Sequence, residues 1–149
     1  MYLNIQSLLA NKAELSFMVN TWNPLSICLS ETCVTEQVLD HESHLSGYYF
    51  IDTLSHSRHT GGIIKYIKEE VMSKTILRES HLNKVWITGI EISVYGQKLM
   101  VFCLYRSPTS SEAEFLSYIE DIFKEYTSNE GILIFIGDFN IDLSKNNFY

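Results

Sequence analysis

The sequence predicts an α/β protein in which the strands of a sheet alternate with helices. Residues 132–136 are five apolar residues without a polar break, which is typical of a strand buried on both faces in a sheet covered by helices. Residues 11–21 place apolar side chains at helical spacing, and so does the stretch that follows Ser111. A chain of 149 residues is expected to form one domain, spanning residues 1–149.

The first half of the chain is predicted to contain one helix between short strands. Residues 1–3 are expected to be a strand that is clipped at its beginning. Asn11 and Glu14 are expected to cap the N-terminus of the helix, and Asn23-Pro24 ends it. One face of this helix carries Leu15, Met18, Val19 and Trp22. A buried strand is expected at residues 25–29, a further strand at residues 48–52 and an apolar segment at residues 63–67. Gly61-Gly62 permits a turn or a close approach before the last of them.

The second half is predicted to contain a β-hairpin, a helix and a final strand. Residues 85–94 alternate in the manner of a strand with one covered face, and Tyr95-Gly96-Gln97 turns them into the apolar run of residues 99–104. Ser111 and Glu114 form a capping box at the start of the helix. Its apolar side chains are Phe115, Ile119, Ile122, Phe123 and Tyr126. The helix leads to the strand of residues 132–136.

Composition excludes several classes of protein. Cys28 and Cys103 lie in apolar runs and are expected to be buried thiols, which together with Cys33 favours a reducing, intracellular setting. The sequence contains no apolar stretch of transmembrane length and no signal segment at its N-terminus, so no membrane association is expected. A net charge of −7 argues against a broad electrostatic grip on nucleic acid, but it is compatible with a phosphate site that uses a metal ion.

Polar residues follow four of the predicted strands at their carboxyl ends, where ligands bind in open α/β sheets. These residues are Asn4, Glu31, Tyr105 with Arg106, and Asp138 with Asn140. Carboxylate and amide oxygens suit Mg²⁺, which can polarise a phosphoryl oxygen, while Tyr and Arg can donate to the charge that builds on a phosphate. The alternative is ordinary loop chemistry: Gly, Asp and Asn are common in turns, and most Glu side chains are solvated.

Other metal motifs in the sequence do not fit. Asp138-x-Asn140-x-Asp142 begins like a calcium-binding EF-hand loop, but Leu143 and Tyr149 stand where that loop needs Gly and Glu. His56 and His59 lie close together but among polar neighbours, and a solvated loop is the preferred interpretation.

Five short motifs, in order along the chain, closely resemble the endonuclease domain of non-LTR (LINE-type) retrotransposons. They are Asn4-Ile5-Gln6-Ser7-Leu8, Leu29-Ser30-Glu31-Thr32, Gly61-Gly62-Ile63-Ile64, Tyr105-Arg106-Ser107-Pro108 and Gly137-Asp138-Phe139-Asn140. That domain belongs to the endonuclease/exonuclease/phosphatase superfamily, with deoxyribonuclease I and the apurinic endonucleases. The resemblance implies a four-layer α/β sandwich of the deoxyribonuclease I-like type. It also implies Mg²⁺-dependent nicking of DNA, which primes reverse transcription in such elements.

The resemblance also implies a role for each residue that matches a motif. Glu31 would be the principal ligand of Mg²⁺, with Mn²⁺ as a substitute, and Asn4 would be its neighbour. Tyr105 would contact the scissile phosphate, Asp138 would orient the attacking water, and Asn140 would stabilise the transition state. The phosphate or DNA contacts are expected from Arg58 and Arg106. DNA would be the partner, no obligate protein partner is evident, and an active protein would work in the nucleus.

The sequence departs from the family at its C-terminal end. The family's domain continues to a further Asp-His pair that acts on the scissile phosphate, and nothing after Asn140 matches it. We therefore expect an incomplete domain, with its first strand clipped and its C-terminal strands missing, and weak or absent nicking. The first alternative is a catalytically dead remnant that acts at most as a binding module. The second is a small-molecule phosphatase of the same superfamily, against which the Tyr-Arg-Ser-Pro and Ser-Glu-Thr motifs weigh.

Overall fold

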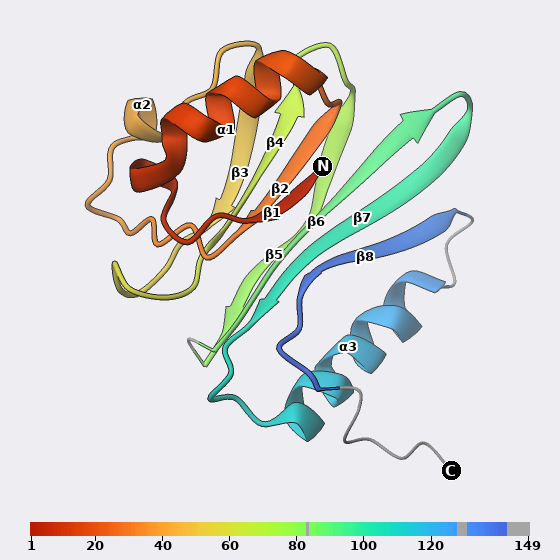
Figure 1. The fold of residues 1–149 in the computed structure, drawn as a ribbon. Coiled ribbons are helices and arrows are strands. Elements are labelled where there is room, and N and C mark those ends of the chain that lie inside the picture. The colour runs from red at the N-terminus through yellow and green to blue at the C-terminus, as the bar shows by residue number, and fades with distance from the viewer. Residues whose placement is uncertain (83, 128–130, 143–149) are drawn as a thin grey trace.

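The computed structural model describes residues 1–82, 84–127 and 131–142, which form three helices and eight strands (Figure 1). The helices are α1 (Leu8–Trp22), α2 (Asp40–Ser43) and α3 (Glu112–Thr127). The strands are β1 (Tyr2–Asn4), β2 (Ser26–Ser30), β3 (Tyr48–Thr53), β4 (Ile63–Lys68), β5 (Ser73–His81), β6 (Val85–Val94), β7 (Gln97–Arg106) and β8 (Ile132–Asp138). None of the helices in these ranges is both long enough and apolar enough to cross a membrane.

The strands form two mixed sheets of four strands each. The first has the order β1-β2-β4-β3, and the second has the order β5-β6-β7-β8. In each sheet a single pair of neighbours is parallel, β1 with β2 and β7 with β8, and the remaining pairs are antiparallel. The two parallel pairs matter for function, because parallel strands bring their carboxyl ends to the same edge of a sheet.

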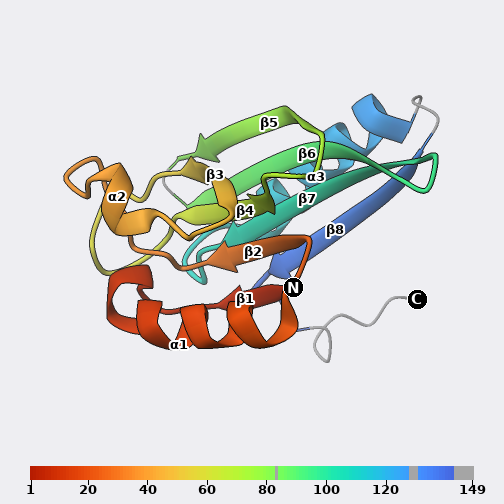
Figure 2. The same cartoon turned by 90° about the horizontal axis from the view of Figure 1, so that it is seen from above.

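The sheets pack face to face, and helices cover their outer faces, which gives four layers (Figures 1 and 2). Helix α1 packs Leu15 and Val19 against the outer face of the first sheet. Helix α3 packs Phe115 and Ile122 against the outer face of the second sheet. Side chains of both sheets fill the space between them, including Trp86 and the two buried thiols Cys28 and Cys103. The predicted α/β sandwich and the predicted burial of these two thiols are confirmed.

Helix α1 differs from its prediction at its N-terminus. It begins at Leu8, one turn before Asn11, and Ser7 is the residue before it. Asn11 lies inside the helix, and its amide donates to the carbonyl of Ile5 over 2.8 Å, which ties the helix to the chain leaving β1. The predicted end at Asn23 is confirmed, since this residue has a left-handed backbone and its N–H donates to the Val19 carbonyl. Trp22, predicted on the buried face, is 62% exposed.

The second sheet departs from the prediction in two of its strands. The hairpin of β6 and β7 forms as predicted, but residues 85–90 are buried on both faces of β6, because the first sheet covers one face and α3 the other. Strand β5 was not predicted. Its apolar residues Ile76 and Leu77 are adjacent rather than alternating, and the register shifts between Thr75 and Leu77.

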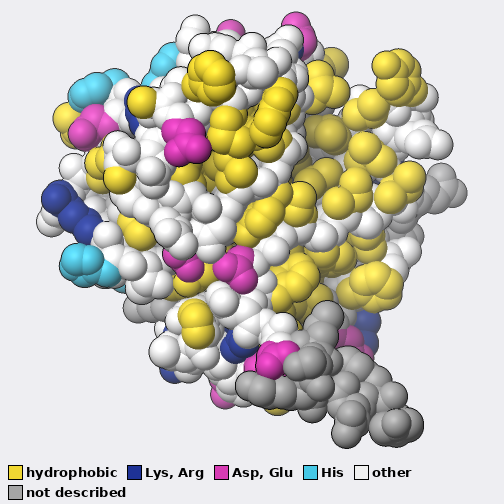
Figure 3. All heavy atoms as spheres, in the orientation of Figure 1, with side chains coloured by type: hydrophobic (Ala, Val, Ile, Leu, Met, Phe, Trp, Pro, Cys, Tyr) yellow, Lys and Arg dark blue, Asp and Glu magenta, His cyan; other side chains and the backbone are white. Residues whose placement is uncertain are grey.

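Strand β8 lies at the edge of the second sheet, so the prediction that it is buried on both faces is wrong. Among the described strands its one paired neighbour is β7, and Ile132 and Ile134 are 49% and 38% exposed. The space-filling view shows apolar side chains gathered over the part of the molecule where β7 and β8 run (Figure 3). A central strand and an edge strand with the same composition cannot be told apart by their apolar run alone.

Candidate active site

The carboxyl ends of β1, β2, β7 and β8 meet at one end of the sandwich. Asn4, the last residue of β1, pairs with Ser30, the last residue of β2, so Glu31 follows directly beside Asn4. In the other sheet Tyr105 of β7 pairs with Asp138, the last residue of β8. The four side chains that the sequence placed at strand ends therefore stand at the same end of two facing sheets.

Asn4 and Asp138 join the two sheets directly. The Asn4 Nδ2 atom donates to Oδ2 of Asp138 over 2.9 Å. The other carboxylate oxygen, Oδ1, accepts from the backbone N–H of Asn140 over 3.1 Å. Both oxygens of the Asp138 carboxylate are thus held in a fixed orientation, and the carbonyl oxygen of the Asn4 amide is left to face other groups.

Glu31 occupies the loop after β2 in a left-handed conformation, with φ of +53°. This conformation costs a residue with a side chain roughly 1–2 kcal/mol. It is held by the loop's hydrogen bonds: the Glu31 carbonyl accepts from Ser7 N over 2.8 Å, and Thr32 N donates to the carbonyl of Gly62 over 3.3 Å. The side chain of Glu31 is half-buried and lies against the Tyr105 hydroxyl.

Tyr105 is buried between the sheets and turns its hydroxyl towards the carboxylates. Its ring packs against Trp86, with 5.6 Å between the ring centroids, and its hydroxyl is 3.4 Å from Oγ1 of Thr60. Burial, with a contribution from Glu31 and Asp138, raises the pKa of Tyr105 to about 12. At neutral pH this hydroxyl is therefore protonated and can donate a hydrogen bond.

The predicted glycine pair leaves room for Trp86, the residue that packs against Tyr105. Gly61 has φ of +87°, and a Cβ atom added there would lie 2.3 Å from Cζ2 of Trp86. The absence of a side chain at position 61 is what allows Trp86 to lie against Tyr105. The prediction of a turn or close approach at Gly61-Gly62 is confirmed, since both residues have positive φ.

Arg106 does not have the position that a phosphate contact requires. Its side chain is only 2% exposed, and Nε donates to the carbonyl of Phe139 over 2.6 Å. Its other nitrogens donate to the carbonyls of Asn140 and Ser110, the latter over 2.6 Å. The arrangement corrects the sequence-based expectation: Arg106 fastens the loops after β7 and β8 to each other, and its donors are already used.

Asn140 takes part in the same anchoring. Its Nδ2 atom donates to the Arg106 carbonyl over 2.7 Å, which uses one of the two amide hydrogens. Its backbone is left-handed, with φ of +48°, and its N–H holds Asp138. Towards the described residues, the second amide hydrogen and the amide oxygen of Asn140 make no hydrogen bond given by the structure.

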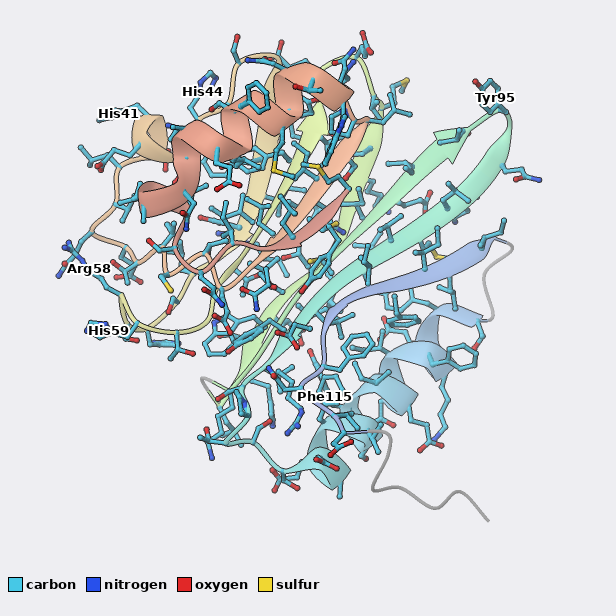
Figure 4. All side chains as sticks on the ribbon, in the orientation of Figure 1. His41, His44, Arg58, His59, Tyr95 and Phe115 are labelled. Carbon is cyan, nitrogen blue, oxygen red and sulfur yellow. The ribbon has the colours of Figure 1, made fainter. Side chains whose placement is uncertain are left out.

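Arg58 stands apart from this group, in the exposed loop after β3. It points away from the body of the molecule next to His59 (Figure 4), and Nη2 donates to Oε1 of Gln37 over 3.1 Å. Arg58, His59 and Gln37 line a cavity of about 540 Å³, together with His56 and Glu36. The same loop ends at Thr60, whose hydroxyl contacts that of Tyr105, but none of the strand-end residues lines this cavity.

A second cavity, of about 590 Å³, opens on the strand-end group itself. It is lined by Tyr2, Asn4, Asp138, Asn140 and their neighbours in the loop after β8. Tyr2 was missed by the sequence argument. A signal for it exists, because Tyr2 and Asn4 are two residues apart on one strand and therefore point to the same face. Burial, with smaller contributions from Cys103, Asp138 and Glu31, raises the pKa of Tyr2 to about 12.

The donor set suits a hydrated Mg²⁺ ion better than a metal held by many side chains. In the described ranges no three His, Cys, Asp or Glu side chains gather as a metal cluster. Glu31, the Asn4 carbonyl oxygen and Asp138 instead offer oxygen atoms from two sheets. Mg²⁺ is commonly bound by one or two carboxylates while it keeps several of its waters. Glu31 and Asn4 would hold the ion, and the Asp138 carboxylate would lie beside it.

Two facing mixed sheets with helices on their outer faces make up a deoxyribonuclease I-like α/β sandwich. Solved structures with this fold are similar to the chain. One is a humanised D. rerio TDP2 with 14 mutations (TM-score 0.69, 16% identity, 96% of this chain and 66% of that one). Another is the endonuclease domain of TRAS1, a telomere-specific non-LTR retrotransposon (0.68, 15%, 96% and 60%). A third is the catalytic domain of Xenopus laevis APE2 (0.68, 16%, 94% and 57%).

These comparisons confirm the fold that the sequence motifs predicted. The chain spans 48% to 66% of the length of the solved chains that it matches. No protein-family model and no curated protein matches its sequence.

Proposed function

We propose that this chain binds DNA and hydrolyses its phosphodiester bonds with the help of Mg²⁺, as the endonuclease part of a retrotransposon-derived protein. The observation that carries the proposal is the hydrogen bond between Asn4 and Asp138, which sets an oriented carboxylate beside Glu31 across the two sheets. The neighbours' names support the substrate class: one structure is D. rerio TDP2 complexed with a single-strand DNA product. Such a protein would act in the nucleus.

Each residue of the group has a separate task in this proposal. Asp138 orients an attacking water and accepts its proton as the water bonds to phosphorus, because donors from Asn4 and Asn140 fix this carboxylate at the wall of the cavity. The oxygen that leaves the phosphorus takes its proton from bulk water. Tyr105 donates its hydroxyl hydrogen to the scissile phosphate, and the remaining amide hydrogen of Asn140 supplies a second donor. Mg²⁺, when bound by Glu31 and Asn4, supplies positive charge for the phosphoryl oxygens.

The second candidate function is a binding module without turnover, and the histidines favour it. All five histidines lie in described segments, and none of them borders the cavity that holds Asp138. A missing general acid or base typically lowers a rate by about 10²- to 10⁴-fold. The first candidate therefore predicts slow nicking and the second predicts none, and metal and DNA binding are retained in both.

A plasmid-nicking assay tests the proposal. Purified chain is incubated with supercoiled DNA in Mg²⁺ or in EDTA, and Mn²⁺ binding is measured in parallel from the free-ion paramagnetic resonance signal. We expect slow, Mg²⁺-dependent nicking that Asp138→Ala abolishes, and weaker Mn²⁺ binding in Glu31→Gln. The matched control is Glu120→Gln, an exposed carboxylate on α3 that pairs with Lys124.

The outcomes separate the candidates. Mn²⁺ binding that depends on Glu31, without detectable nicking, would establish the binding module. Nicking that persists in EDTA or in Asp138→Ala would contradict the assignment of the site. Equal Mn²⁺ affinity in Glu31→Gln and Glu120→Gln would remove Glu31 from the metal site.

A further inference from the structure

Tyr2 lines the cavity at the strand ends but lies outside the five sequence motifs. It stands two residues before Asn4 on β1, and its side chain lines the same cavity as Asp138 and Asn140. It also packs against the buried cluster of Trp86 and Tyr105. Tyr2 and Tyr105 therefore approach the two carboxylates from different sheets, Tyr2 from the first and Tyr105 from the second.

The Tyr2 hydroxyl is held by one partner. It lies 2.7 Å from Oγ of Ser30, the residue directly before Glu31, and Ser30 is completely buried. Two hydroxyl groups that share one hydrogen bond use one of their two hydrogens in it. When Ser30 donates to Tyr2, the Tyr2 hydrogen remains available, and Tyr2 is the member of the pair that reaches the cavity.

The surroundings of Tyr2 indicate what this hydrogen meets. The Asp138 carboxylate lines the same cavity as Tyr2, and Glu31 directly follows Ser30, the partner of the Tyr2 hydroxyl. A hydroxyl donor at the wall of a cavity of about 590 Å³, with a carboxylate in the same wall, suits an anionic oxygen atom that shares the site with a cation. A phosphate oxygen has that chemistry, and charged acceptors form the stronger hydrogen bonds.

We infer that Tyr2, oriented by Ser30, is a second tyrosine donor of the active site and hydrogen-bonds an oxygen atom of the bound phosphate. This inference deepens the proposed function and rests on it for the identity of the substrate. Tyr105 would contact the phosphate from the second sheet and Tyr2 from the first. The phosphate would then be held from both sides of the Asn4–Asp138 contact.

The test uses inorganic phosphate as the probe, so that it does not depend on turnover. Phosphate binding is measured by calorimetry in saturating Mn²⁺, with the wild-type chain, Tyr2→Phe, Ser30→Ala and Tyr49→Phe. Tyr49 is a matched control, because its hydroxyl also pairs with a serine, Ser73, in a contact that joins β3 to β5. The Mn²⁺ affinity of each variant is measured separately.

We expect Tyr2→Phe to weaken phosphate binding about 10- to 100-fold, the range for losing one hydrogen bond to a charged acceptor. Ser30→Ala should weaken it about threefold, because a hydroxyl that has lost its orienting partner still donates. Tyr49→Phe should bind phosphate normally, and all variants should bind Mn²⁺ like the wild type. Ser30→Ala removes the hydrogen-bond partner of the Tyr2 hydroxyl but keeps Tyr2 itself. It therefore tests the Tyr2–Ser30 contact even if Tyr2→Phe folds poorly.

Unchanged phosphate affinity in Tyr2→Phe overturns the inference, as does an equal loss in Tyr49→Phe. A wild-type chain that binds no phosphate in Mn²⁺ overturns it as well. The plasmid assay separates this result from the fate of the proposed function. Phosphate binding that depends on Tyr2 in a chain that does not nick DNA supports the inference and counts against nicking. If the wild-type chain nicks DNA and Tyr2→Phe binds phosphate normally, the inference about Tyr2 is wrong and the proposed function is supported.

Discussion

Asn4 and Asp138 lie 134 positions apart in the sequence, yet the amide nitrogen of one is 2.9 Å from a carboxylate oxygen of the other. The contact connects the last residue of β1 to the last residue of β8, and so connects the carboxyl ends of the two sheets. Position 4 therefore holds an uncharged amide, where a third carboxylate would be repelled by Glu31 and Asp138. Replacing Asn4 by Asp tests this effect.

Asn4→Asp should make folding depend on metal. The substitution replaces a donor with a like charge, so without metal we expect the free energy of unfolding to fall by about 1–3 kcal/mol, the cost of a lost hydrogen bond and an unpaired acceptor. Added Mg²⁺ should restore most of it by neutralising the carboxylates. Thermal unfolding in EDTA and in Mg²⁺ measures both effects. Asn20→Asp, on the exposed side of α1, should show neither, and an equal Mg²⁺ response in both variants would refute the prediction.

Gly61→Ala should destabilise the protein more than Gly96→Ala does. Both glycines have positive φ, +87° and +78°, so both substitutions carry the same backbone cost. At position 61 the new methyl group also meets Trp86 at 2.3 Å, whereas nothing lies within 4 Å of it at position 96. We expect about 1 kcal/mol for Gly96→Ala and about 2–4 kcal/mol for Gly61→Ala, by urea denaturation. Equal losses would mean that Trp86 moves aside freely.

Sequence reasoning predicted the positions that local rules decide. A strand followed by a polar loop places its last side chain at the sheet edge, so Asn4, Glu31, Tyr105 and Asp138 could be predicted to stand at strand ends. The turn at Gly61-Gly62 followed from the freedom of glycine. The four-layer arrangement came from the resemblance of the motifs to a family, and not from the residues' periodicity.

The rest depends on how distant segments pack against each other. Arg106 follows a strand, as expected, but which way it turns is decided by the carbonyls of Phe139 and Asn140, more than 30 residues away. Tyr2 belongs to the site only because the other sheet lies over it. Ile134 is likewise exposed because β8 lies at the edge of its sheet. The sequence of a single strand does not show whether that strand is central or at an edge.

Arg58 and Arg106 should respond to substitution in different ways. Arg106→Ala removes a buried side chain that bridges the carbonyls of Phe139, Asn140 and Ser110, and we expect a loss of about 2–4 kcal/mol in the free energy of unfolding. Arg58→Ala removes an exposed side chain and should change stability by less than about 0.5 kcal/mol. It should instead weaken DNA binding at low salt. The slope of the logarithm of the DNA affinity against the logarithm of the salt concentration should fall by about one, because one counterion fewer is released. Fluorescence anisotropy with labelled DNA checks this, and a normal salt dependence would remove Arg58 from the interface.

The exposed side of β8 should promote association between molecules. Ile134 is 38% exposed, and in the part of the chain that the structure describes β8 has a paired neighbour on one side only. Such strand edges are the usual sites of edge-to-edge pairing. We expect Ile134→Lys to reduce self-association in sedimentation velocity at high protein concentration. Leu116→Lys, which adds the same charge to an exposed position on α3, should have a smaller effect. Equal effects would show that net charge, and not this surface, controls association.

Tyr105 should make the metal-free protein lose stability in strongly alkaline solution. Its pKa is raised from 10.0 to about 12 by burial, with Glu31 and Asp138 contributing. Between these two values the unfolded chain has lost the proton and the folded chain keeps it, so the folded state binds more protons and the free energy of unfolding falls as pH rises. The part of the free energy of unfolding that comes from the raised pKa of Tyr105 is complete below pH 10 and is lost as pH rises towards 12.

Urea denaturation at pH 9 and pH 11 measures this loss. The free energy of unfolding should decline less for Tyr105→Phe than for the wild type. Tyr95→Phe, fully exposed at the tip of the β6–β7 hairpin (Figure 4), should decline like the wild type. If Tyr105→Phe and the wild type decline equally, the Tyr105 hydroxyl loses its proton as readily in the folded chain as in the unfolded one, and it could not serve as the neutral donor that the proposed reaction requires.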